Sequence, residues 1–167
     1  MTRLYAQPYD ITATGFYFET AEEYAALAAQ VVNDYGQPVE EFEIQFIDGE
    51  AIDAALAQAW GLNQANLGRF FEVALAWENR EKVRCIIAMN EGIGFDVEAG
   101  DIDALDVDIY SVETLRALAE QFVDDGLFGD IPEPLRFYID YDAIARDLGM
   151  DYTEAVIAGE RLIYRCG

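Results

Sequence analysis

The chain has 167 residues, enough to bury a hydrophobic core, and 53 % of them are hydrophobic, with aromatic residues making up 13 % of the chain. This apolar content excludes an intrinsically disordered acidic tail, which could not bury enough surface to offset its chain entropy. The formal net charge is −23, from 33 acidic and 10 basic residues, and it argues against direct binding to nucleic acid or anionic lipid.

The chain begins with elements typical of a small α+β module. Gly15–Phe18 has the composition of a strand, and Thr20 and Glu23 have the spacing of a capping box at the start of a helix. Apolar residues then recur at helical spacing as far as Val31, and Gly36 is expected to end this helix.

The next element is a predicted strand over Glu41–Ile47, where apolar residues alternate with acidic or amide residues. Such a strand turns its apolar side chains to a core and its carboxylates to solvent. A short helix carrying Ile52, Leu56 and Trp60 follows and completes a predicted N-terminal module over residues 1–60.

The middle of the chain predicts two helices, around Phe70–Trp77 and Glu81–Met89, in a helical module over residues 61–105. Most bases of this part form a cluster: Arg80, Lys82 and Arg84. The cluster is either a docking patch or local charge compensation, with Glu78 and Lys82 at the favourable i, i+4 spacing.

The last part of the chain again predicts both strands and helices. Val107–Ile109 alternates with aspartates, Ser111 is a candidate N-cap for a helix through Phe122, and residues 153–157 and 161–165 form a predicted hairpin. The sequence therefore predicts an α+β fold made of an elongated chain of three small modules, with short β-sheets, packed helices and a helical middle. The third module covers residues 106–167.

The residue types exclude several kinds of chemistry. The chain has no histidine and only two cysteines, so a Ser-His-Asp triad, an imidazole metal site and a disulfide framework are all excluded, and we expect no enzyme and no cofactor. The run from Asp101 to Asp108 resembles a calcium loop, but its sixth position lacks the required glycine. With no apolar run long enough to span a membrane, we expect a cytoplasmic protein.

The distribution of acids is the main functional signal. No lysine or arginine lies between Arg3 and Arg69, a tract with eleven acids, and a second tract without bases extends from Cys85 to Leu115. One explanation is a salt-adapted or highly soluble surface, which should scatter its acids. The other is a nucleic-acid mimic, whose carboxylates would stand in for phosphates. Charge density selects four candidate acids for this role: Asp101, Asp103, Asp106 and Asp108.

The net charge sets the scale of such a mimic. B-DNA carries one phosphate charge per ~1.7 Å of axis, so 23 negative charges match roughly 40 Å of duplex. A compact globule of this length also has a diameter of ~40 Å and would spread those charges over all its faces. The mimicry hypothesis therefore requires an elongated molecule, whose target is a protein with a basic DNA-binding groove.

Three sequence blocks resemble the ArdA antirestriction proteins: Gly15–Phe18, Glu40–Gly49 and Ile131–Asp142, the last continuing to Leu148. The resemblance implies a three-module mimic of bent B-form DNA that often forms a dimer. It also implies that the protein occupies the DNA-binding groove of type I restriction–modification enzymes and so protects mobile DNA entering a bacterium.

The resemblance also supplies candidate phosphate-mimicking acids within the matched blocks: Glu40, Glu41, Glu43, Asp48, Glu133, Asp140, Asp142 and Asp147. Each could instead be an ordinary solvated residue, and Asp140 could cap the helix that follows. The alternative function is an acidic binding partner or chaperone of another basic DNA-binding protein. Phe122, Phe128 and Tyr138 could line a dimer contact, although core packing is the simpler role.

Overall fold

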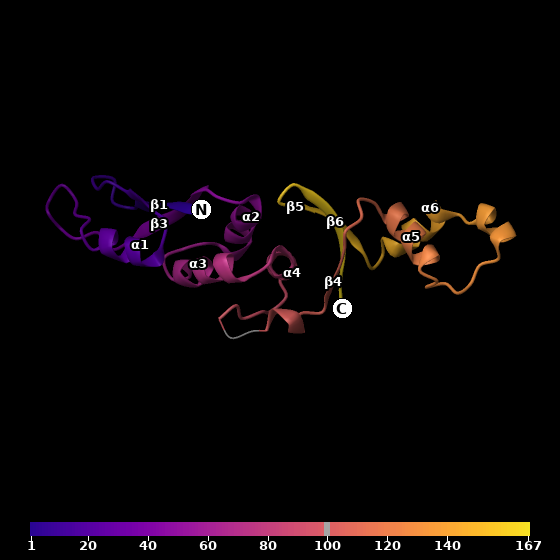
Figure 1. Cartoon of the computed structure of the whole chain (residues 1–167). Coiled ribbons are helices and arrows are strands. Elements are labelled where there is room, and N and C mark those ends of the chain that lie inside the picture. Colours follow the sequence, from indigo (N-terminus) through magenta and orange to yellow (C-terminus); the bar gives the residue numbers. More distant parts are fainter. Residues whose placement is uncertain (99–100) are drawn as a thin grey trace. The chain divides into compact units, whose positions relative to one another are not determined.

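The computed structural model describes residues 1–98 and 101–167, which divide into two compact units (Figure 1). Unit 1 is Met1–Asp103 and unit 2 is Ala104–Gly167. Each unit contains one three-stranded antiparallel sheet together with helices, so the predicted α+β class is confirmed. The further division of residues 1–105 into two modules stays a prediction.

The sheet of unit 1 has the strand order β2-β1-β3. Its strands are β1 (Arg3–Pro8), β2 (Phe16–Phe18) and β3 (Phe42–Asp48). The predicted alternation holds along β3, because Phe42 and Ile44 are buried whereas Glu43 is exposed. One face of the sheet therefore joins the core and the other presents polar side chains.

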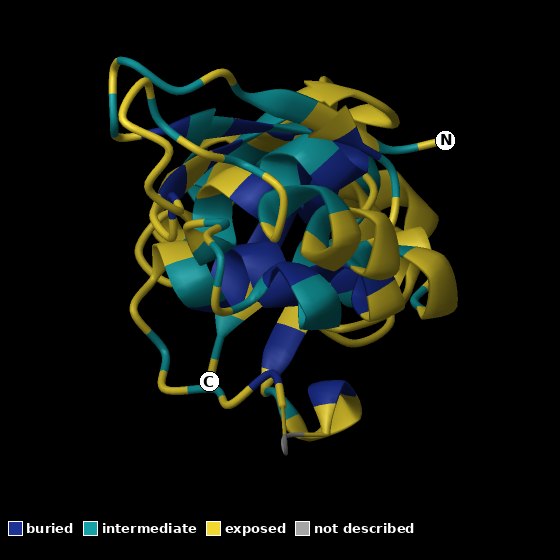
Figure 2. Cartoon of the chain, turned by 90° about the vertical axis from the view of Figure 1, so that its left-hand side faces the viewer, coloured by how far each residue is buried: buried dark blue, intermediate teal, exposed yellow. Residues whose placement is uncertain are grey.

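The helices of unit 1 pack against that sheet and against one another. They are α1 (Ala21–Ala28), α2 (Ala51–Trp60), α3 (Leu67–Ala76) and α4 (Asn79–Asn90), followed by the short 3-10 helix η1 (Ile102–Ala104). Their fully buried side chains include Leu56, Phe70 and Ile86, which share the core with Leu4 and Phe18 of the sheet. In Figure 2 buried segments lie in the interior, while exposed segments follow the loops and parts of the helices.

The first helix is shorter than predicted. It begins after Thr20 as expected but ends at Ala28, because the next residues pair with the chain that leads into β3. The Val39 amide donates to the Val31 carbonyl at 3.1 Å, and Val32 forms a β-bridge with Pro38. Val31 and Val32 are β-branched, and such residues favour extended backbone over helix.

Unit 2 is built in the same way around the strand order β4-β6-β5. Its elements are β4 (Val107–Tyr110), α5 (Leu115–Asp124), the 3-10 helix η2 (Glu133–Tyr138), α6 (Tyr141–Leu148), β5 (Thr153–Ile157) and β6 (Glu160–Cys166). The core consists of Leu118, Phe122 and Ile163, with Tyr110 and Tyr152 among the partly buried residues around it. The predicted C-terminal hairpin is confirmed as the β5–β6 pair.

The N-cap predicted at Ser111 is wrong. Helix α5 is capped by Thr114, whose hydroxyl accepts a hydrogen bond from the Ala117 amide at 3.1 Å. The carboxylate of Glu154 accepts a hydrogen bond of 2.9 Å from the amide of Leu115, the first residue of α5. Two amides that the helix itself cannot satisfy are thus bonded three residues later than the sequence indicated.

The described residues contain no helix that is both long enough and apolar enough to cross a membrane. The longest of them, α4, has 12 residues, whereas about 20 are needed to span the hydrocarbon core of a bilayer.

Candidate functional site

The acidic residues of the chain lie almost entirely at its surface. Of the 33 acids, only Asp53 is buried. All twelve acids selected from the sequence are exposed: Glu40, Glu41, Glu43, Asp48, Asp101, Asp103, Asp106, Asp108, Glu133, Asp140, Asp142 and Asp147. Each of these carboxylates is therefore accessible, and the hydrogen bonds and ion pairs of the chain divide them into three groups.

The first group is unpaired. Within residues 1–98 and 101–167, the carboxylates of Glu40, Glu41, Asp106 and Asp147 have no hydrogen bond or ion pair. Glu43 is close to this group, because it accepts only one long bond, at 3.3 Å, from the amide of Gln45. These carboxylates have all or most of their hydrogen-bonding capacity left for a partner.

The second group is held by arginines. Asp103 lies 3.6 Å from Arg84, Glu133 lies 3.7 Å from Arg136, and Asp142 accepts a 2.6 Å bond from Arg116. That last bond raises the pKa of Arg116 above its ordinary value. Asp108 faces Arg165 across the β4–β6 ladder. A neighbouring cation offsets part of the field that each of these acids presents to solvent.

The third group stabilises turns and helix ends. Asp48 accepts a 3.0 Å bond from the Gly49 amide, and Asp101 accepts one of the same length from the Asp103 amide. Asp140 is the N-cap of α6 and accepts from Ala143 at 3.0 Å, which is the capping role that the sequence left open. In the part of the chain that is described, no three acidic or cysteine side chains are placed to hold a metal ion.

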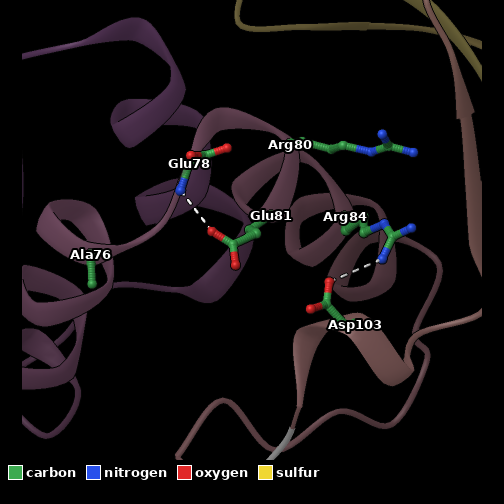
Figure 3. A pocket seen from close by; sticks show the side chains of 6 residues that line it. All are labelled: Ala76, Glu78, Arg80, Glu81, Arg84 and Asp103. Carbon is green, nitrogen blue, oxygen red and sulfur yellow. Dashed lines mark hydrogen bonds and ion pairs between the residues drawn. The ribbon is translucent and has the colours of Figure 1, made fainter.

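The basic residues around α4 do not form one patch. In Figure 3 the Arg84 side chain points toward Asp103, while the Glu81 carboxylate accepts a hydrogen bond of 2.7 Å from the Glu78 amide. With Arg80, these side chains line a recess of about 560 Å³ that mixes both signs of charge. Glu78 is the N-cap of α4, and the Lys82 ammonium bonds Asp53 and not the Glu78 carboxylate. The predicted i, i+4 pair is therefore wrong.

Lys82 instead forms the one buried ion pair among the described residues. Its ammonium donates to Asp53 of α2 at 2.6 Å and to the Ala74 carbonyl at 2.9 Å. This ion pair was not predicted from the sequence, although one signal was present. Asp53 shares the apolar stripe of α2 with Ile52 and Leu56, where an acid needs a buried partner.

Comparison with known proteins adds a family to this description of the surface. The sequence model of the family described as antirestriction protein (ArdA) matches residues 58–160, more than half of the chain. The chain belongs to the ArdA antirestriction family. The resemblance seen in the sequence is thereby confirmed, and membership of this family implies an antirestriction function. A comparison with curated proteins finds no match.

The ArdA match runs from the end of α2 to the turn between β5 and β6, so it includes parts of both units. It contains the block Ile131–Asp142 and the whole middle segment. It does not contain the two N-terminal blocks, Gly15–Phe18 and Glu40–Gly49, so the unpaired acids beside β3 rest on the sequence and structure of this chain.

Proposed function

We propose that this chain is a DNA mimic that inhibits a type I restriction–modification enzyme by occupying its DNA-binding groove. One observation carries the proposal: all twelve candidate carboxylates are exposed, on a chain of net charge −23 that belongs to an antirestriction family. Lysines and arginines that hold phosphates in such a groove would bind these carboxylates instead. Inhibition would be stoichiometric and would need no cofactor.

Within this proposal the unpaired acids carry most of the recognition. Glu40, Glu41 and Glu43 lie at the start of β3, and Asp106 and Asp147 belong to unit 2. A carboxylate that already binds an arginine, as Asp142 binds Arg116, must give up that bond before it can bind a partner. The paired acids are assigned a smaller contribution for this reason.

An acidic partner or chaperone of another basic DNA-binding protein is the alternative, because exposed carboxylates serve either role. Competition with DNA separates the two functions. A purified type I enzyme is bound to a fluorescent duplex that carries its recognition sequence, and the chain is titrated into the complex. The mimic displaces the duplex at near one-to-one stoichiometry, less effectively as salt rises. A chaperone binds a free histone-like protein and leaves the complex intact.

Two variants with equal charge changes test which acids matter. The first is Glu40→Gln with Glu41→Gln and Glu43→Gln, and the matched control is Asp124→Asn with Glu133→Gln and Asp142→Asn. The control acids are already ion-paired with Arg136 or Arg116. We expect the first variant to lose at least about tenfold in affinity for the enzyme and the control to lose less than about threefold. Equal losses would mean that net charge alone drives binding.

We also propose that the chain forms a homodimer through an apolar patch of unit 2. Five large side chains there are exposed: Leu127, Phe128, Leu135, Phe137 and Tyr138. Of the aromatic residues considered for this contact, Phe122 packs in the core, whereas Phe128 and Tyr138 are exposed and do not. Sedimentation equilibrium should show a dimer that Phe137→Ser with Tyr138→Ser converts to monomer. A monomer at every concentration would contradict this assignment.

A further inference from the structure

Two loops of unit 1 carry large apolar side chains into solvent. The first loop lies between β1 and β2, and the second connects α1 to β3; both lie at the same end of unit 1 (Figure 1). Tyr9 is 65 % exposed, Ile11 is 96 % exposed and Tyr35 is 82 % exposed. Single exposed apolar residues are ordinary in soluble proteins, so exposure alone decides nothing. The hydrogen bonds that hold these loops distinguish them from ordinary exposed residues.

The two loops, which we call the tip (residues 9–14 and 32–38), are joined by side chains. The carboxylate of Asp10 accepts from the Thr12 amide at 2.9 Å and from the Thr12 hydroxyl at 2.8 Å. Across to the second loop, it accepts from the Asn33 amide group at 3.0 Å. The Thr12 hydroxyl in turn accepts from the Asp34 amide at 3.2 Å.

The second loop is also closed on itself. The side-chain oxygen of Asn33 accepts from the Tyr35 amide at 3.0 Å and from the Gln37 amide at 2.9 Å. Between them, Gly36 takes the left-handed conformation, with φ of 74°, which costs a glycine little. Tyr35 is thus displayed from a turn whose backbone is fixed on both sides.

The network persists at any pH near neutrality. The hydrogen bond from the Thr12 amide is the largest cause that lowers the pKa of Asp10, followed by those from the Thr12 hydroxyl and Asn33. Because the folded pKa lies below the unfolded one, the network is present above the unfolded pKa and is lost only as the pH falls through the folded value. The tip therefore needs little further ordering when it binds.

We infer that the tip is an anchor that inserts Tyr9, Ile11 and Tyr35 into an apolar recess on a cationic protein surface. Tyrosines on an ordered backbone are typical of the few residues that dominate protein interfaces. The inference rests on the proposed function, and it places the recess on the same DNA-binding enzyme. There, long-range charge would set the association rate and the anchor would set the lifetime of the complex.

Charge determines which occupant fits the tip. No lysine or arginine lies between Arg3 and Arg69, while the acids near the tip in sequence include Asp34, Glu40 and Glu41. The tip of a second copy would bring the same acids and be repelled, as would nucleic acid or an anionic membrane. A cationic protein surface is attracted instead and can also offer apolar side chains.

The test measures association and dissociation rates separately. A type I enzyme without DNA is immobilised, and three proteins are passed over it: the wild type, the variant Tyr9→Ser with Ile11→Ser and Tyr35→Ser, and the control Leu75→Ser. Leu75 is 88 % exposed on α3 and lies outside the tip. The triple variant should dissociate at least about tenfold faster, equivalent to ~1.4 kcal/mol, with an association rate within about twofold of the wild type. The control should match the wild type.

A second variant keeps every apolar side chain and every charge. Asn33→Ala removes the side-chain bond from Asn33 to Asp10 and the two bonds by which the Asn33 side chain closes the second loop. It should speed dissociation severalfold because part of the ordering cost returns. It also serves as the test if the triple variant fails to fold. If the triple variant or Asn33→Ala dissociates within twofold of the wild-type rate, the anchor is overturned. The mimicry proposal still stands in that case if Glu40→Gln with Glu41→Gln slows association. A wild type that binds no enzyme overturns both.

Discussion

The two units carry nearly the same density of negative charge but place their cations differently. Unit 1 has 19 acids and five bases over 103 residues, and unit 2 has 14 acids and five bases over 64 residues, so their net charges are −14 and −9. In unit 1 the only lysine is buried against Asp53. In unit 2, Arg116 and Arg136 each contact two carboxylates on the surface.

The comparison shows that the positions of the few cations decide where negative charge stays unscreened. Among the residues that the structure describes, the carboxylates of Glu40 and Glu41 beside β3 have no partner, whereas in unit 2 those of Asp142 and Glu133 are already paired. Unit 1 therefore offers the less screened carboxylates. Variants confined to one unit can test this contrast.

The largest expected effect comes from breaking the buried ion pair of unit 1. Lys82→Met leaves the carboxylate of Asp53 buried without its cation, and loss of one partner in such a pair costs about 3–5 kcal/mol. Urea unfolding followed by tryptophan fluorescence measures this loss in unit 1 alone, because both tryptophans, Trp60 and Trp77, lie there.

The control replaces both partners. Asp53→Leu with Lys82→Met removes the uncompensated charge, so it should recover most of the lost stability. If the single and double variants are equally destabilised, the ion pair is not the reason that unit 1 depends on Lys82.

In unit 2 the matching experiment is a cavity in the core. Leu118 is fully buried against Phe122 and Ile163, so Leu118→Ala should destabilise the unit by about 2–5 kcal/mol. Circular dichroism should report the loss, while the midpoint from tryptophan fluorescence stays close to that of the wild type. A shift of both signals by the same amount would show that the two units unfold together.

Sequence patterns predicted the elements well where one residue period dominated. The alternation along β3 and the helical spacing in α2 and α5 placed these elements correctly, because burial of one face determines both. Local rules failed where distant residues decide. Val31 leaves the helix to bond Val39, and α5 begins at Thr114 partly because Glu154 bonds the next amide.

For the candidate site, the exposure of the acids could be predicted from the sequence, but their pairing could not. Surface acids can be read from composition, because charged side chains are rarely buried without a partner. Their pairing could not be read, since Arg116 and Asp142 are 26 residues apart and meet only through the packing of α5 and α6. The tip was missed because its hydrogen bonds join Asp10 and Asn33, which are 23 residues apart.

The two cysteines give a smaller contrast between the units. Burial raises the pKa of the Cys85 thiol to about 11, whereas Cys166 at the end of β6 is only half-buried. Because the folded pKa exceeds the ordinary value of 9.0, the protonated Cys85 thiol contributes to the stability of unit 1. This contribution is fully present below pH 9 and is lost as the pH rises toward 11. The loss for wild type relative to Cys85→Ala should be on the order of 2 kcal/mol.

Urea unfolding of both proteins at pH 8 and pH 10.5 measures that difference. At pH 8 a thiol reagent should also label Cys166 much faster than Cys85, which reacts only when unit 1 opens. Equal labelling rates, or parallel pH dependence of the two proteins, would show that Cys85 is accessible in the folded chain.

The smallest expected effect compares two threonine helix caps that form the same hydrogen bond. The hydroxyls of Thr20 in unit 1 and Thr114 in unit 2 each accept one amide bond of 3.1 Å. Thr114→Ala should cost about 1 kcal/mol, because α5 buries Leu118 and Phe122 and cannot fray without disturbing the core of unit 2. Thr20→Ala should cost only a few tenths of a kcal/mol of stability, because α1 buries no residue completely and can open locally.

Serine substitutions at both positions keep the hydroxyl and should restore wild-type stability, which separates the capping bond from the lost methyl group. Denaturant unfolding gives the free energies, and amide hydrogen exchange shows where opening occurs. Thr20→Ala should speed exchange within α1 while leaving α3 and α4 protected. If Thr20→Ala instead lowers the global stability of unit 1 by as much as Thr114→Ala lowers that of unit 2, then α1 is coupled to the core as tightly as α5, and burial does not set the worth of a cap in this protein.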